Sequence, residues 1–305
     1  MPGTAVKFRE KTDFVDSVIC DDALSALSLI RSGIVDAIVT SPPYYGQRDY
    51  SYPNQIGSEA TAEAYLERLL EVFKECMRVL KETGTLWLNL GDKYADGRLL
   101  GLPWRLALAL QANGWILRSD VIWWKPNAMP SSVKNRLTCD HEYLFFLTKN
   151  NAYYFDGDAI REPHVTFSEH SRMMGGRNHF GKRGGTPEKG KNCGNQNLHR
   201  ARWDQAFHPK GRNKRTVWEV PLSKFPDAHF AVFPEKLIEP CILAGSPDGG
   251  LVLDPFIGSG TTALVALRLR RHFIGIDCSK RYCEMAENRI REQSLVLPFS
   301  ASPDL

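Results

Sequence analysis

The stretch Ser41-Pro42-Pro43-Tyr44 places two hydrogen-bond acceptors and an aromatic ring within four residues. Proline has no backbone N–H and holds the loop rigid, so the Pro42 carbonyl is available to a ligand, and the Ser41 hydroxyl supplies a second acceptor. Tyr44 offers a flat face for stacking. This combination suits a planar base that carries an exocyclic NH2 group. A structural proline turn with core tyrosines is the alternative interpretation.

A second loop, DPFIGSGTTA from Asp254 to Ala263, follows an apolar strand and opens a helix. Gly258 and Gly260 let the backbone approach a ligand, and a helix N-terminus favours an anion. Asp277 ends the next strand, where a carboxylate can hold two ribose hydroxyls. Asp254 suits a cationic ligand group. S-adenosylmethionine carries an ammonium, a sulfonium and an adenosine, so we favour it over a nicotinamide dinucleotide.

Alternating strands and helices are expected to position these two loops. Apolar patterning predicts strands at 15–20, 35–40, 85–90, 116–124, 142–148, 217–220, 250–253 and 272–276, and helices at 23–30, 62–80, 103–113, 234–244, 261–270 and 279–292. This order indicates an α/β fold with a parallel sheet and right-handed crossovers. The tail from Ser294 onward is predicted to be irregular.

The composition is that of a globular protein: 43% of the 305 residues are apolar and 24% are charged. No apolar run is long enough for a membrane helix, and the N-terminus has no apolar signal core. The seven cysteines are scattered without a CxxC pair, which argues against a disulfide framework and a zinc site. We expect a cytoplasmic protein, from a prokaryotic or phage-infected cell, with no metal and no membrane contact.

Positive charge is concentrated between Arg161 and Arg215, where thirteen Lys and Arg face four Asp and Glu. The remaining residues carry a small excess of negative charge. A basic, Gly-rich stretch inside a mildly acidic chain is typical of a polyanion partner. A solvated insertion without a partner is the alternative.

The two loops, in this order, resemble the β-type amino DNA methyltransferases, in which a (D/N/S)PP(Y/F) loop precedes an FxGxG loop. The similarity runs from about Val15 to Arg291 and includes DAL at 22–24, WWKPN at 123–127, HEY at 141–143, RTVW at 215–218 and HFAVFPE at 229–235. The resemblance implies a Rossmann-like methyltransferase sheet with circularly permuted motif order. It also implies two catalytic segments, 1–160 and 216–305, around a target-recognition insertion at 161–215.

In this family, serine at the first position of the PPY motif is the form usual in enzymes that methylate the N4 amine of cytosine. The resemblance therefore implies site-specific methyl transfer from S-adenosylmethionine to a flipped cytosine in double-stranded DNA, in a restriction-modification or epigenetic role. Adenine-N6 methylation is the alternative. Methylation of an RNA or protein amine and a non-catalytic nucleic-acid-binding protein are more remote. A second copy of the chain and a restriction endonuclease on a separate chain are candidate partners.

The resemblance also assigns roles to single residues. The predicted catalytic residues are Ser41, Pro42, Pro43 and Tyr44. The predicted cofactor-binding residues are Asp22 at the adenine edge, Phe230 and Ala231 at the methionine end, Asp254 at the ammonium, the backbone of Phe256, Gly258, Gly260 and Thr261 at the carboxylate, and Asp277 at the ribose. The predicted DNA contacts are Arg172, Arg177, Arg202 and Arg212. Asp22 and Asp277 have an alternative role as helix caps, and Asp92 receives no role.

Overall fold

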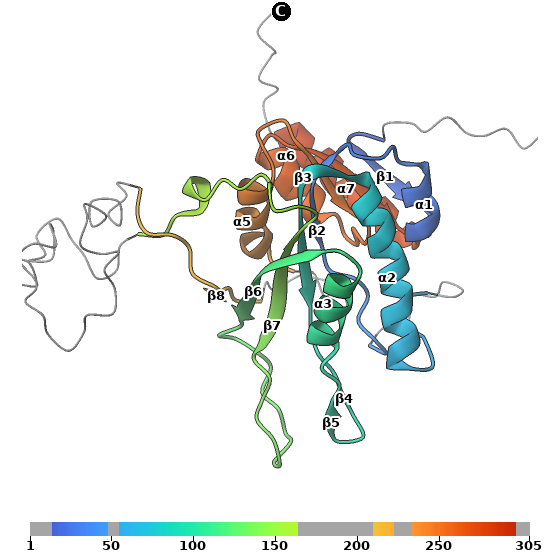
Figure 1. The fold of residues 1–305 in the computed structure, drawn as a ribbon, viewed down its shortest axis with the longest axis vertical. Coiled ribbons are helices and arrows are strands. Elements are labelled where there is room, and N and C mark those ends of the chain that lie inside the picture. The colour runs from blue at the N-terminus through green and yellow to red at the C-terminus, as the bar shows by residue number, and fades with distance from the viewer. Residues whose placement is uncertain (1–13, 48–54, 164–209, 223–232, 297–305) are drawn as a thin grey trace, which may run out of the picture. The chain divides into compact units, whose positions relative to one another are not determined.

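The computed structural model describes residues 14–47, 55–163, 210–222 and 233–296. The chain forms two compact units, one made of Met1–Asp156 with Thr216–Leu305 and the other of Gly157–Arg215. The first unit holds the sheet and both loops; Figure 1 shows the whole chain. Among the described residues, no helix is long and apolar enough to cross a membrane.

Within the described residues, eight strands of the first unit form one sheet in the order β1-β10-β9-β2-β3-β7-β6-β8. Their bounds are β1 Ser17–Cys20, β2 Val35–Thr40, β3 Leu80–Leu90, β6 Ile116–Trp124, β7 His141–Thr148, β8 Val217–Glu219, β9 Leu251–Asp254 and β10 His272–Asp277. Neighbouring strands are parallel except where β7 pairs with β3 and β6. The expectation of a wholly parallel sheet is therefore wrong at β7. The reason is that residues 125–140 contain no crossover helix, so β6 and β7 pair as a hairpin.

Helices cover the sheet in two groups. In the first group, α1 (Ala23–Leu29) packs on α2 (Ala62–Val79), and α2 packs on α3 (Leu102–Ala112). In the second, α5 (Glu235–Gly245) packs on α6 (Thr261–Arg268), and α6 packs on α7 (Lys280–Val296). Figure 1 shows α2 and α3 beside the sheet opposite α5. The apolar face of α2, including Tyr65, Leu69 and Phe73, is fully buried in the core, as its helical spacing predicts.

Two local elements differ from the prediction. Helix α7 continues to Val296, so the expected irregular tail from Ser294 is wrong for its first three residues; no Gly or Pro interrupts the helix, and the first such residue is Pro298. A small hairpin of β4 (Tyr94–Ala95) and β5 (Arg98–Leu99) was not predicted. Its turn is Asp96-Gly97, with φ of 49° and 74°, which is the backbone that a two-residue hairpin turn requires.

The strand directions bring the ends of β1, β10, β9, β2, β3 and β6 and the start of β7 to one side of the sheet, here called the carboxyl edge. Strands β9 and β2 are neighbours there, although they are more than 200 residues apart in the chain. The connections leaving these two strands lead to opposite halves of the sheet. In open α/β sheets, ligands bind at such a switch point. The SPPY loop follows β2 and the glycine loop follows β9, so both flank this point.

Candidate active site

The SPPY loop is held from both sides by the chain. The Tyr65 hydroxyl, on α2, donates a hydrogen bond of 2.9 Å to the Pro43 carbonyl. The Gly46 N–H donates to the Gly57 carbonyl at 2.6 Å, which closes the far end of the loop. The Pro42 carbonyl forms no hydrogen bond with the described residues. It therefore keeps the acceptor capacity that the sequence predicts for it.

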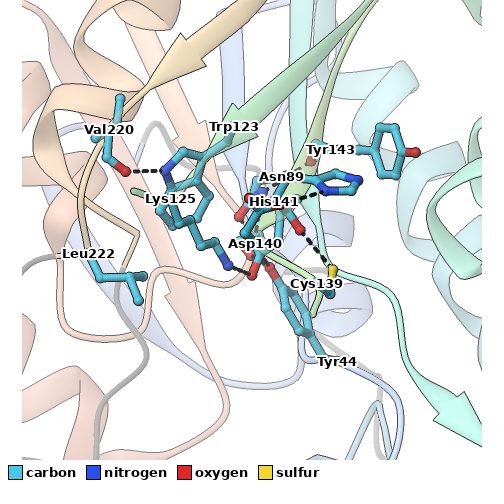
Figure 2. A network of polar contacts seen from close by, with 12 residues as sticks. Tyr44, Asn89, Trp123, Lys125, Cys139, Asp140, His141, Tyr143, Val220 and Leu222 are labelled. Atoms are coloured by element: carbon cyan, nitrogen blue, oxygen red, sulfur yellow. Dashed lines mark hydrogen bonds and ion pairs between the residues drawn. The ribbon is translucent and has the colours of Figure 1, made fainter. Parts of the chain in front are cut away.

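The Tyr44 hydroxyl belongs to a polar network, part of which Figure 2 shows. Its hydroxyl oxygen is 2.7 Å from Glu142 Oε2 and 3.2 Å from Asn89 Oδ1, and the Ser41 hydroxyl donates to it at 3.4 Å. Burial, followed by the charge of Glu142, raises the pKa of Tyr44 well above its usual value. The phenol therefore stays protonated and can donate to one of these acceptors. Gly91 lies against the ring, where an added Cβ would be only 2.8 Å from Tyr44 Cε2.

Three strands supply the rest of this network. Asn89, near the end of β3, donates to Glu142 Oε2 at 3.2 Å and to the Tyr143 carbonyl at 3.1 Å. Glu142, near the start of β7, forms an ion pair through Oε1 with the Lys125 ammonium, which follows β6. That ammonium also lies 4.5 Å from the centre of the Trp123 ring. The partly buried carboxylate is thus balanced by a cation and two further donors, as a charge in such a place requires.

Asn89, Glu142 and Lys125 received no role from the sequence. Asn89 is the one polar residue inside the apolar run LWLNL, and it is 2% exposed, which is a signal that could have identified it. Lys125 and Glu142 were noted only within motifs shared with the family. Their contact depends on the pairing of β6 with β7, in which Trp123 lies opposite Glu142.

Asp254 joins the two loops at the switch point. Its carboxylate is 1% exposed and accepts from the Thr40 hydroxyl at 2.6 Å, the Thr262 hydroxyl at 2.6 Å and the Phe256 N–H at 3.0 Å. Burial raises its pKa to about 6, although these donors lower it. Asp254 therefore fastens β2 to the glycine loop. Its predicted contact with a ligand ammonium would have to share an oxygen with these hydroxyl groups.

Asp277 shapes the glycine loop from the next strand. Its Oδ2 accepts from the Gly258 N–H at 3.1 Å, and its Oδ1 accepts from the Ser279 N–H at 2.8 Å, so it also orients the approach to α7. Burial raises the pKa of Asp277. Gly258 has φ +52° and open space where a Cβ would lie, whereas Gly260 has φ +88° and a Cβ there would be 3.0 Å from Ala286.

Asp22 lies beside this group because β1 pairs with β10, so that Cys20 is opposite Asp277. Its Oδ1 caps α1 by accepting from the Leu24 and Ser25 N–H groups at 3.0 and 3.3 Å. The capping role is therefore present, and the Oδ2 atom forms no hydrogen bond with the described residues. Asp92 likewise has a structural role, since its Oδ1 accepts from the Leu102 N–H that opens α3.

The chemical groups of these residues fit an S-adenosylmethionine molecule. Asp254 and Asp277 end the neighbouring strands β9 and β10, Asp22 follows the next strand β1, and Gly258 in the loop after β9 has open space where a Cβ would lie. Carboxylates suit ribose hydroxyls and an ammonium, and backbone N–H groups at a helix start suit a carboxylate. Phe256 packs partly buried against the core. The Thr261 side chain is buried, and its hydroxyl is 3.5 Å from Arg289.

The remaining predicted residues divide into two sets. Phe230, Ala231, Arg172, Arg177 and Arg202 lie outside the described residues. Arg212 is described, and its guanidinium is 3.2 Å from Glu162 within the second unit. In the part of the chain that the structure describes, no group of His, Cys, Asp and Glu could hold a metal ion.

Comparison with known proteins agrees with this geometry. The family model described as "DNA methylase", of the N6/N4 methyltransferase type, matches residues 35–288. The Type II methyltransferase M.Cfr9I of Citrobacter freundii is 40% identical over 92% of this chain and 90% of its own length. The Type II methyltransferase M.SmaI of Serratia marcescens is 38% identical, over 90% of each chain.

Two solved structures share the fold. PvuII DNA methyltransferase (cytosine-N4-specific) has a TM-score of 0.65 at 20% identity, covering 94% of this chain and 88% of its own. A Thermus thermophilus protein complexed with S-adenosyl-L-methionine has a TM-score of 0.58 at 25% identity, and the match covers 92% of this chain and 96% of its own. The chain belongs to the N6/N4 DNA methylase family. It is an S-adenosylmethionine-dependent DNA methyltransferase with a Rossmann-like sheet, which confirms the predicted family, fold class and cofactor.

Proposed function

We propose that the enzyme methylates the N4 amine of a cytosine taken out of double-stranded DNA. The observation that carries this proposal is the hydrogen-bonded chain from Ser41 through Tyr44 to Glu142, with distances of 3.4 and 2.7 Å. Because the Ser41 hydroxyl donates along this chain, its lone pairs are left to accept from an incoming amine. Serine at this position is also the form usual in the cytosine-N4 enzymes that the chain resembles.

For this reaction the protein must localise the lone pair of the cytosine amino nitrogen. The amino nitrogen of cytosine is a poor nucleophile because its lone pair is delocalised into the ring. The Ser41 hydroxyl and the Pro42 carbonyl accept hydrogen bonds from its two N–H groups and draw the nitrogen toward a tetrahedral geometry. When bound, S-adenosylmethionine would supply the methyl group from its sulfonium, and the sulfur would leave as a neutral thioether. Catalysis is then mostly positioning and electrostatics.

Proton loss follows the transfer, since the methylated amine is then cationic. The nitrogen donates a proton to Ser41 Oγ, the Ser41 proton passes to the Tyr44 oxygen, and the Tyr44 proton passes to Glu142 Oε2. The three protein groups are already hydrogen-bonded in this order, Ser41 to Tyr44 and Tyr44 to Glu142. Lys125 pairs with the other oxygen of Glu142 and holds the carboxylate in place. Tyr44 also keeps its proposed role as the stacking surface for the base.

The glycine-loop side of the site binds the cofactor in this proposal. Asp277 holds the ribose hydroxyls, the free oxygen of Asp22 faces the adenine edge, and the backbone from Phe256 to Gly260 receives the methionine carboxylate. Asp254 neutralises the ammonium while it fastens the two loops together. Thr261, Phe230 and Ala231 complete the proposed set.

The insertion 161–215 reads the DNA in this proposal. Its Lys and Arg residues contact phosphates and give salt-dependent affinity, while a few side chains contact base edges. Arg172, Arg177, Arg202 and Arg212 are the proposed DNA contacts. Since the relatives are named Type II methyltransferases, we also propose a restriction endonuclease as a separate partner chain.

Nucleoside analysis tests the base assignment. Unmethylated genomic DNA is incubated with the enzyme and S-adenosylmethionine carrying a CD3 group, and the digested nucleosides are analysed by mass spectrometry. We expect labelled N4-methylcytosine with the wild type and a large loss of label with Ser41→Ala. Labelled N6-methyladenine instead would overturn the cytosine assignment while keeping the loop chemistry.

A further inference from the structure

The connection between β6 and β7, residues 125–140, projects from the carboxyl edge (Figure 1), and hydrogen bonds hold its base in place. The Lys125 N–H donates to the Asp140 carbonyl at 2.8 Å, and the Trp124 ring N–H donates to the Asp140 carboxylate at 3.1 Å. Asn127 exchanges two hydrogen bonds with the backbone of Leu222, at 2.8 and 3.1 Å. The root of this loop is therefore rigid, and it begins beside the Lys125–Glu142 pair of the site.

The outer part of the loop, residues 126–139, has an unusual surface. Leu137 is 90% exposed and Met129 is 81% exposed, the two most exposed large apolar side chains among the described residues. The same stretch contains Lys134 and Arg136 and no Asp or Glu. Single exposed apolar residues need no explanation. Here, however, two lie on one basic loop at the edge that holds the reacting groups.

The β4–β5 hairpin contacts this loop and helps to hold it in place. The β4–β5 hairpin also leaves the carboxyl edge, after β3, and the guanidinium of Arg136 lies 3.7 Å from the centre of the Tyr94 ring on that hairpin. Its base is closed by a hydrogen bond of 2.9 Å from the Leu100 N–H to the Lys93 carbonyl. The residue next to Leu137 is thus anchored, so the apolar side chain is presented at a defined place beside the site.

We propose that this loop is a DNA wedge: Leu137 enters the base stack of the duplex at the place that the target base leaves. This rests on the proposed function, in which the target base leaves the helix. A stacked base cannot reach Ser41 and the partly buried Tyr44, and extruding it leaves a gap that costs unstacking energy. Proteins fill such gaps with apolar side chains. Lys134 and Arg136 carry the charge that suits the flanking phosphates.

The wedge is tested with two duplex oligonucleotides that carry the target site, mapped beforehand from DNA methylated by the wild-type enzyme. In one duplex the target base is paired, and in the other an abasic position stands opposite it, so that little work is needed to extrude it. Methyl transfer is counted with labelled S-adenosylmethionine, whichever base receives the group. The variants are Leu137→Ala, the conservative Leu137→Met, and Leu108→Ala as a control on an exposed leucine of α3.

We expect Leu137→Ala to lose about tenfold in kcat/KM on the paired duplex and to recover to within about twofold of the wild type on the abasic duplex. The kcat/KM of Leu137→Met and of Leu108→Ala should stay within about twofold of the wild-type value on both duplexes. An equal loss on the two duplexes, or no loss on the paired one, would overturn the wedge. Because the label reports transfer to either base, a failure of the cytosine assignment leaves this test intact.

Discussion

At the scale of single residues, the site is built from buried polar groups that the chain itself satisfies. Tyr44 has Ser41, Asn89 and Glu142 around its hydroxyl, and Asp254 has three donors around its carboxylate. Pre-formed hydrogen bonds of this kind cost little reorganisation when the substrate arrives. The two acceptors offered to the base, at Ser41 and Pro42, are left over after this internal pairing.

Glu142→Gln tests whether the network positions Ser41. The amide of glutamine keeps the size of the side chain but cannot pair with Lys125 as an ion. We expect the single-turnover rate of methyl transfer to fall roughly tenfold to a hundredfold, while cofactor affinity stays within about threefold. The matched control is Glu82→Gln, because Glu82 pairs with Lys149 near the opposite edge of the sheet. A loss of cofactor binding, or of folding, in Glu142→Gln would reduce Glu142 to a structural residue.

Asp254 predicts a pH dependence of stability. Burial raises its pKa from 3.8 to about 6, so the folded protein holds this proton more tightly than the unfolded chain does. Its contribution to the free energy of unfolding is therefore fully present below about pH 4 and is lost as the pH rises through about 6. We expect the difference in the free energy of unfolding between the wild type and Asp254→Asn to fall by about 2–3 kcal/mol over this range. Urea unfolding at pH 4.5 to 7.5 measures it, and parallel curves would contradict the assignment.

At the scale of elements, turn chemistry and strand ends decide what reaches the carboxyl edge. The strand Val35–Thr40 follows from sequence pattern, because a buried parallel strand is a continuous apolar run, here ended by Ser41-Pro42. The start of α6 at Thr261 likewise follows from Gly258 and Gly260 directly before it. The β4–β5 hairpin could have been found from its Asp-Gly turn. The antiparallel direction of β7 could also have been found, because no helix is predicted between the strands at 116–124 and 142–148, and parallel neighbours are usually joined by a crossover helix.

Alanine substitutions at Gly258 and Gly260 should have different effects, the first mainly on cofactor binding and the second mainly on stability. Gly260→Ala sets a Cβ 3.0 Å from Ala286 at φ +88°, so we expect the free energy of unfolding to fall by about 2–3 kcal/mol. Gly258→Ala meets open space at φ +52° and should cost about 1 kcal/mol. The new methyl group would lie where the cofactor approaches, so the affinity of the protein for the cofactor should fall about tenfold. Chemical unfolding and calorimetric titration measure both, and unchanged cofactor affinity in Gly258→Ala would place the ligand elsewhere.

At the scale of the whole molecule, the sheet order brings together groups that the sequence keeps apart. Thr40 and Asp254 meet because β2 and β9 are neighbours, and Asn89 meets Glu142 because β3 pairs with β7. The sequence motifs identified the two loops, the alternation of strands and helices predicted the α/β class, and the resemblance supplied the Rossmann-like methyltransferase sheet. The Lys125–Glu142–Tyr44 contacts could not be predicted, because they depend on the register of three strands.

The two ends of the proposed target-recognition insertion pair with each other, which allows a deletion test. In the second unit, the backbone of Glu162 pairs with that of Arg212 through hydrogen bonds of 2.9 and 2.8 Å, so the chain leaves and returns at one point. Replacing residues 164–209 by a short Gly-Ser linker should therefore leave cofactor affinity within about threefold. DNA binding should lose both its sequence preference and much of its salt dependence. Sequence preference that survives the deletion would mean that another part of the chain reads the bases.

The central claim is that Ser41 acts on the target amine and not on the fold or the cofactor. The direct measurement is single-turnover methyl transfer by Ser41→Ala, with cofactor affinity measured on the same preparation. We expect the transfer rate to fall roughly a hundredfold or more while cofactor affinity stays within about threefold. Transfer within a few-fold of the wild type, or a loss of cofactor binding, would contradict the account and leave the SPPY loop as a structural turn.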